Sequence, residues 1–191
     1  MAKKVLGVAR VSYHLERWVA EKDKAHVRAL LNQTCDALPA PARDSIVNHW
    51  SKAPAMIEFI DHLIPGFKPR TGGKTRDCGR LIIYRHDYLL GMPQNLAKAL
   101  LAHEFAHAFV CSSIDELRRI KAMAEKDLKC EIQFDGSWDQ FGLDPDSADC
   151  NFRVVAGNFL ILKESYFMKL NEKRVRQINR EWGFDEDALS H

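Results

Sequence analysis

The residues best suited to chemistry form the pattern His-Glu-x-x-His at His103, Glu104 and His107. Residues four apart lie one above the other on a helix, so both imidazoles can reach the same metal ion. Glu104 is rotated by about 100° from His103, so it can reach a water on that ion more easily than the ion itself. Zinc lowers the pKa of a bound water, and a neighbouring carboxylate can accept its proton as the water attacks a carbonyl. The pattern therefore predicts a Zn²⁺ site with His103 and His107 as ligands and Glu104 as general base.

Apolar residues surround this motif, among them Leu101, Phe105 and Phe109. A helix exposed to solvent would carry polar side chains on one face, so we expect the histidines to point into the protein. Pro93 suits the first turn of a helix. The sequence thus predicts a helix from Pro93 to about Val110.

The third metal ligand is less clear from the sequence. A catalytic zinc usually has three protein ligands and keeps a fourth position for water. After His107 the only histidine is the terminal His191, so we expect a carboxylate or a residue before the motif. The nearby downstream acids are Asp139, Asp144, Asp146 and Asp149.

Residues 149–160 resemble the helix that follows HExxH in the ImmA/IrrE-type zinc metallopeptidases. In that family a glutamate ligand precedes an Ala-Asn pair and a Phe-Ala-Gly-x-Phe-Leu-like stretch, and residues 155–160, Val-Ala-Gly-Asn-Phe-Leu, match the last part. The resemblance covers roughly residues 80–160 and puts Asp149 at the ligand position. Phe152-Arg153 replaces the Ala-Asn pair. The resemblance implies a zincin-like fold, a bound Zn²⁺ ion, and hydrolysis of peptide bonds in a protein or peptide substrate.

Two other alignments give other ligands. Ala148-Asp149 also matches the Ala-Asp ending of the Glu-x-x-Ala-Asp pattern in other zincins, which puts Asp146 near the ligand position. Residues 136–142 resemble the aspzincin motif Gly-Thr-x-Asp-x-x-Tyr-Gly, one residue short, with Asp139 as its acid. Helical periodicity favours Asp149, because Asp149 shares a line with Phe152 whereas Asp146 suits an N-terminal turn. We therefore expect His103, His107 and Asp149 to bind the metal.

Helices dominate the elements that the sequence predicts. We expect them over residues 13–38, 44–50, 55–63 and 114–128, and from Asp144-Pro145 to about Trp182. Ser113 and Glu116 form a capping box for the helix over 114–128. Residues 68–80 are expected to be a loop, and Leu81–Tyr84 is the best strand candidate.

The predicted fold is therefore α+β, mostly helical with a small sheet. We expect a single zincin-like domain over residues 1–191, with an N-terminal helical part over 1–66 and a metal-binding core over 80–185. In such folds an edge strand commonly pairs with the substrate backbone, and Leu81–Tyr84 is the candidate strand. Candidates for stabilising the oxyanion are Tyr84, His86, Arg153 and Tyr166.

Composition excludes several classes of function. The net charge is only +2 in 191 residues, which argues against an extended nucleic-acid interface. The basic residues of the 68–80 loop leave a nucleic-acid-associated protein as a weaker hypothesis. No apolar run approaches the ~20 residues of a membrane span, and no signal peptide is evident at the start of the chain.

The five cysteines are odd in number and form no CxxC pair. Such a pattern is typical of free thiols in a reducing compartment, so we expect a cytoplasmic protein. The leading hypothesis is a zinc-dependent metallopeptidase. The competing hypothesis is a zinc-binding regulatory or interaction module that keeps the fold but has little or no turnover.

Overall fold

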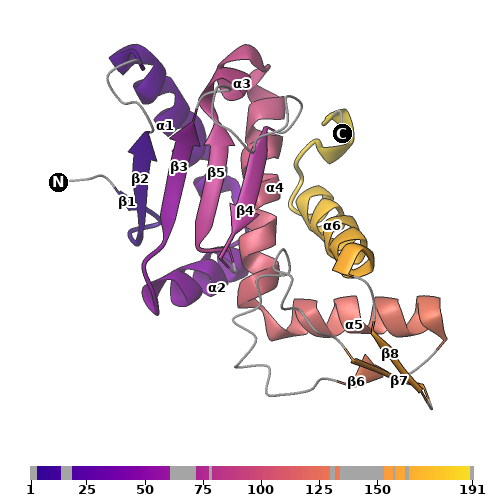
Figure 1. Ribbon diagram of the computed structural model, residues 1–191. Coiled ribbons are helices and arrows are strands. Elements are labelled where there is room, and N and C mark those ends of the chain that lie inside the picture. The colour runs from indigo at the N-terminus through magenta and orange to yellow at the C-terminus, as the bar shows by residue number, and fades with distance from the viewer. Residues whose placement is uncertain are drawn as a thin grey trace.

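The computed structural model describes residues 4–13, 19–60, 72–77, 79–129, 132–133, 153–156, 158–161 and 164–189. It confirms a mixed α+β chain with a small sheet (Figure 1). The strands of the main sheet are β1 (Lys4–Val5), β2 (Ala9–Tyr13), β3 (Met56–Ile60), β4 (Gly73–Arg76) and β5 (Leu81–Arg85). The helices are α1 (Glu21–Ala37), α2 (Ala40–Ser51), α3 (His86–Gly91), α4 (Gln94–Ser112), α5 (Ile114–Leu128) and α6 (Glu164–Glu181).

The main sheet has the strand order β1-β2-β3-β5-β4. β2, β3 and β5 are parallel neighbours, whereas β4 runs antiparallel to β5 and β1 antiparallel to β2. A parallel connection needs a crossover, and α1 and α2 supply it between β2 and β3. The strand order places the antiparallel strand β4 at one edge of the sheet, beside α4 (Figure 1).

Aromatic side chains form the centre of the core on one face of this sheet. Tyr13, Phe59 and Tyr84 occupy one row of the register, and their rings stack with centroids 5.2 and 5.7 Å apart. The hydroxyl of Tyr84 donates to the carbonyl of Leu101 in α4, 2.8 Å away. The row of stacked rings thus attaches the sheet directly to the helix that carries the HExxH motif.

Helix α4 is buried nearly all round, in agreement with its alanine- and leucine-rich sequence. It packs against α1, α2, α5, α6 and β4. Phe105 is fully buried and contacts Trp50 of α2, with ring centroids 5.9 Å apart. A helix enclosed in this way holds its polar side chains in fixed positions, because close-packed neighbours leave few rotamers open.

Several predicted elements are confirmed. Helix α4 occupies the predicted range, with Pro93 as its N-cap residue, and β5 begins at the predicted Leu81. Helix α5 begins and ends where predicted, and the Ser113 hydroxyl accepts a hydrogen bond from the Glu116 amide. The Glu116 side chain does not complete the capping box. It binds Arg174 of α6 instead, which joins α5 to α6 through a buried ion pair.

The N-terminal third contains more strand than predicted. The helix expected from Tyr13 begins only at Glu21, because residues up to Tyr13 form β2. The helix expected over 55–63 is wrong over residues 56–60, which form β3. Ile57 and Phe59 are fully buried there, and their alternation with Glu58 is the period of a strand. The loop expected over 68–80 likewise contains β4.

The helix expected from Asp144 to about Trp182 is wrong over residues 153–156 and 158–161, whereas residues 144–152 lie outside the described residues. Residues Arg153–Ala156 and Asn158–Ile161 form the antiparallel strands β7 and β8, which make a second sheet with β6 (Ile132–Gln133). Val154, Val155 and Ile161 are β-branched, and such residues favour strands. Among the described residues after β8, α6 and the short 3-10 helix η2 (Glu186–Ala188) are helical.

The helices of the described ranges include none that is both long and apolar enough to cross a membrane. This agrees with the lack of a long apolar run in the sequence.

Candidate metal centre

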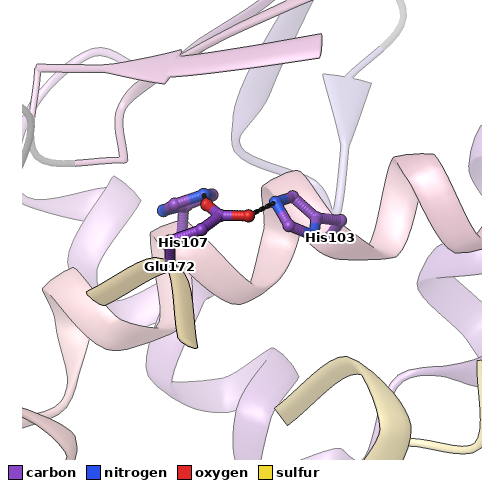
Figure 2. A group of neighbouring side chains, drawn as sticks. All are labelled: His103, His107 and Glu172. Atoms are coloured by element: carbon purple, nitrogen blue, oxygen red, sulfur yellow. Dashed lines mark ion pairs between the residues drawn. The ribbon is translucent and has the colours of Figure 1, made fainter. Parts of the chain in front are cut away.

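Helix α4 presents His103 and His107 on one face, as the four-residue spacing predicts. Their ring centroids lie 5.1 Å apart, and the residues are only 6% and 8% exposed. Both rings turn toward α6 (Figure 2). Two imidazoles held this close in a buried setting can bind one ion without rearrangement of the helix.

Glu172 of α6 completes the group. Its Oε1 atom lies 3.5 Å from Nε2 of His103, and its Oε2 atom lies 3.4 Å from Nε2 of His107 (Figure 2). Ligand atoms around a tetrahedral zinc are about 3.3 Å apart when each bond is about 2.0–2.1 Å long. The three side chains therefore fit the dimensions of a metal site, and they are the group among the described residues that could hold a metal ion.

Glu172 is not among the ligands that the sequence predicts. The expected ligand Asp149 and the alternatives Asp146 and Asp139 lie outside the described residues. Glu172 was missed because the predicted helix placed the search for a ligand at its start, near residue 149. The structure supplies the reason that this position faces inward, because Val175 and Asn179, three and seven residues after Glu172 on the same helix face, are buried.

The electrostatics of the group favour a cation. Burial alone would lower the pKa of His103, but hydrogen bonds to Glu172 and Glu186 outweigh it and raise that pKa to about 10. Burial would raise the pKa of Glu172, but hydrogen bonds from both histidines hold it well below its ordinary value. Without metal, the carboxylates thus keep a proton on His103. A divalent cation would replace that proton and satisfy the same negative charge.

Glu104 lies against the edge strand β4. Its Oε2 accepts a hydrogen bond of 2.7 Å from the Thr75 hydroxyl, and both residues are at least 96% buried. A Cβ at Gly73 would approach Oε1 of Glu104 to 2.6 Å, so only glycine leaves room for the carboxylate. Glu104 is outside the metal-ligand group, as its position on the helix predicts. Thr75 and Gly73 therefore fix the carboxylate of the residue that follows His103.

The strand predicted to lie at the edge does not lie there. β5, which contains Leu81–Tyr84, is paired on both sides, with β3 and with β4. In the described part of the sheet β4 is the edge strand next to α4, and its pairing is with β5 alone. The turn between β4 and β5 packs tightly on α4, because a Cβ at Gly79 would lie 2.5 Å from Cα of Ala108.

Two of the candidate oxyanion residues have other roles. Tyr84 is fully buried, and burial raises its pKa well above the ordinary value. The Nδ1 atom of His86 lies 2.9 Å from the carbonyl of Ile60, which ties α3 to β3. The side chains of Arg153 and Tyr166 lie outside what the structure describes.

Comparison with known proteins gives no match: no family model, no curated protein and no solved structure matches the chain. The resemblance to the ImmA/IrrE-type metallopeptidases therefore stays a prediction. The functional argument depends on the site itself.

Proposed function

We propose that the protein is a zinc-dependent metallopeptidase with a zincin-like fold. One observation carries the proposal: ligand atoms of His103, His107 and Glu172 lie within 4.8 Å of one another, close enough to share one ion. Glu104, the residue after His103, is held against the edge strand β4. Two histidines and one carboxylate leave a fourth position for water, which is the ligand set of catalytic zinc sites. Structural zinc sites usually use four protein ligands with cysteine among them.

Zinc is the metal that these ligands favour. Imidazole nitrogen is a ligand for zinc, copper, iron and nickel, whereas sites for magnesium and calcium use oxygen alone. A buried group with two nitrogens and one carboxylate oxygen therefore excludes the hard cations. Zinc also accepts the tetrahedral arrangement that the two distances from Glu172 permit.

The chain's own residues divide the work of hydrolysis. When bound, zinc would lower the pKa of a coordinated water and polarise the scissile carbonyl. Glu104 would accept the water's proton and transfer it to the leaving amine, as general base and then general acid. Thr75 holds one oxygen of Glu104 by a 2.7 Å hydrogen bond, which leaves Oε1 as the atom that carries the proton.

The position of the edge strand β4 supports the proposal that the substrate is a peptide. β4 runs past Glu104 from Gly73 to Arg76, and its backbone groups on the side away from β5 have no strand partner in the described sheet. An extended peptide can pair with such an edge through backbone hydrogen bonds. The substrate would then lie next to α4 with a backbone carbonyl near the metal.

The test is metal content and proteolysis in parallel. Purified protein should bind one zinc ion per chain and cleave a casein-type substrate. Glu104→Gln should keep the zinc but lose cleavage, because an amide cannot accept the proton. Glu125→Gln is the matched control, because Glu125 is a partly buried glutamate on α5 that pairs with Lys121 of the same helix, and this variant should behave as the unaltered protein does.

The outcomes separate the two hypotheses. Retained zinc with cleavage lost only in Glu104→Gln supports the peptidase. Retained zinc with no cleavage by any variant favours the zinc-binding regulatory module. Absence of zinc from the unaltered protein, even after zinc is added, would contradict both.

A further inference from the structure

A second glutamate, Glu186, reaches the metal centre from the C-terminal end of the described chain. It begins η2, and its side chain has no exposed surface. Its two oxygens lie 3.2 and 3.1 Å from Nδ1 of His103, on the opposite side of the ring from the atom that faces Glu172. Asn179 of α6 donates a hydrogen bond of 2.6 Å to the same carboxylate.

The turn that carries Glu186 is firmly attached. Helix α6 ends at Glu181, and Gly183 follows it with a φ of +85°, which allows the chain to reverse toward α4. The amide of Phe184 then donates to the carbonyl of Asn179, and Leu189 is buried in the core. Trp182 packs on Phe109 of α4, with ring centroids 5.6 Å apart. The position of Glu186 is therefore set by the core on both sides of it.

The charges around Glu186 favour a bound cation. A buried carboxylate is unfavourable unless a positive group and hydrogen bonds compensate it. Glu172 and Glu186 together carry two negative charges beside neutral ligand histidines, which equals the charge of one divalent ion. Arg176 lies at the rim, 2.9 Å from Glu172 and 4.0 Å from Glu186. Arg176 offsets part of this charge, and with neutral histidines the group stays net negative, which favours a cation between α4 and α6.

We propose that Glu186 is a positioning residue of the metal centre, which accepts a hydrogen bond from Nδ1 of His103 and so directs Nε2 toward the ion. The proposal rests on the proposed function, because it assigns the zinc to the Nε2 side of the ring. A histidine ligand whose other nitrogen donates to a carboxylate has a fixed tautomer and ring orientation and binds metal more tightly. Glu186 therefore makes the C-terminal turn part of the metal site.

The second histidine ligand, His107, also has a polar side chain, that of Asn171, near its Nδ1 atom, but at a longer distance. The Nδ2 atom of Asn171 lies 3.5 Å from Nδ1 of His107, and Oδ1 of Asn171 is buried without a hydrogen-bond partner. Rotation of this amide would place its oxygen where Nδ1 of a metal-bound His107 can donate to it. The neutral amide of Asn171 would orient His107, whereas the carboxylate of Glu186 also adds charge. Substitution of Glu186 should therefore weaken metal binding more than substitution of Asn171.

The experiment measures zinc affinity by competition with a chromophoric chelator. Glu186→Gln keeps the shape and loses the charge, and Glu186→Ala loses both. Removal of such outer partners typically weakens metal binding about 10–100-fold, so we expect roughly tenfold for Glu186→Gln and up to about 100-fold for Glu186→Ala. Asp187→Asn is the matched control, since Asp187 is an exposed neighbour that pairs with Arg180. The zinc affinity of this variant should equal that of the unaltered protein.

Two spectroscopic measurements separate positioning from a loss of fold. The visible spectrum of the Co²⁺-substituted protein should change in both Glu186 variants and not in Asp187→Asn. In the unaltered zinc protein, NMR should show a slowly exchanging proton on Nδ1 of His103 and metal on Nε2. That measurement needs no variant, so it stands even if Glu186→Ala fails to fold.

Unaltered zinc affinity and cobalt spectrum in both Glu186 variants would overturn the proposal, as would metal on Nδ1 of His103. None of these readouts uses proteolysis, so a protein that binds zinc but cleaves nothing would contradict the proposed function alone. Failure of the unaltered chain to bind zinc would overturn both.

Discussion

The hydrogen bond from Thr75 to Glu104 gives a prediction that can be worked out in free energy. The substitution is Thr75→Val, which keeps the shape and removes the hydroxyl. The bond is 2.7 Å long, its acceptor is a carboxylate, and the two residues are only 3% and 4% exposed. Hydrogen bonds to charged groups contribute about 1.5–3 kcal/mol. We therefore expect the free energy of unfolding to fall by about 2 kcal/mol, or Tm by about 4–8 °C for a chain of this size.

Thr34→Val is the matched control. Thr34 is also fully buried, but its hydroxyl donates over 2.9 Å to a neutral acceptor, the backbone carbonyl of Leu30. Such a bond contributes about 0.5–1.5 kcal/mol, so this variant should lose about half as much stability. Urea denaturation of the metal-free proteins measures both values.

A double-mutant cycle with Glu104→Ala isolates the pair. Once the carboxylate is absent, Thr75→Val should cost about 1 kcal/mol less than in the unaltered protein, because contacting residues couple. The reasoning is refuted if Thr75→Val is no more costly than Thr34→Val, or if the two substitutions simply add.

Three further predictions concern the metal centre. Glu172→Ala should lose stoichiometric zinc in elemental analysis while Asp149→Ala retains it, and the reverse result would favour the ligand expected from the sequence. In metal-free protein, the raised pKa of His103, about 10 against an ordinary 6.5, contributes stability that is fully present below pH 6.5 and lost as the pH rises through about 10. Urea midpoints across that range should fall less in His103→Gln, and equal slopes would contradict the ion pairs with Glu172 and Glu186. Gly73→Ala should displace the carboxylate of Glu104 and slow cleavage by up to about 100-fold with zinc retained, and an unchanged rate would show that the side chain adapts.

Local signals account for what could be predicted. The HExxH motif, the apolar residues around it and Pro93 together define α4, its buried histidines and the separate position of Glu104. Ser113 marks the start of α5 in the same way. All of these features depend on residues a few positions apart, where helical geometry alone fixes which side chains meet.

Tertiary pairing accounts for what could not. Gly72, Gly73 and the basic residues of segment 68–80 are typical of a loop, yet residues 73–76 form a strand because β5 offers them a partner. Segment 55–60 is short and apolar, a pattern that fits a helix as well as a strand. Residues 56–60 form a strand because they pair with β2 on one side and with β5 on the other. Propensity is a weak predictor where a neighbour supplies the hydrogen bonds.

The third ligand shows the same limit at the level of the site. Glu172 approaches the histidines only because α6 packs against α4, where Asn179 donates to the carbonyl of Ala99. The buried ion pair of Arg174 with Glu116 holds α6 on the neighbouring helix α5. No spacing rule connects residue 172 to the motif. The resemblance that favoured Asp149 assumed a helix over residues that include β7 and β8.

Anomalous diffraction at the zinc absorption edge, from crystals of zinc-loaded protein, tests the central claim most directly. A zinc ion held by these three residues should give one strong peak per chain, about 2.0–2.1 Å from Nε2 of His103 and of His107 and about 2.0–2.2 Å from a carboxylate oxygen of Glu172. No peak at this position, or a peak bound by the histidines and Asp149 with Glu172 turned away, would contradict that claim.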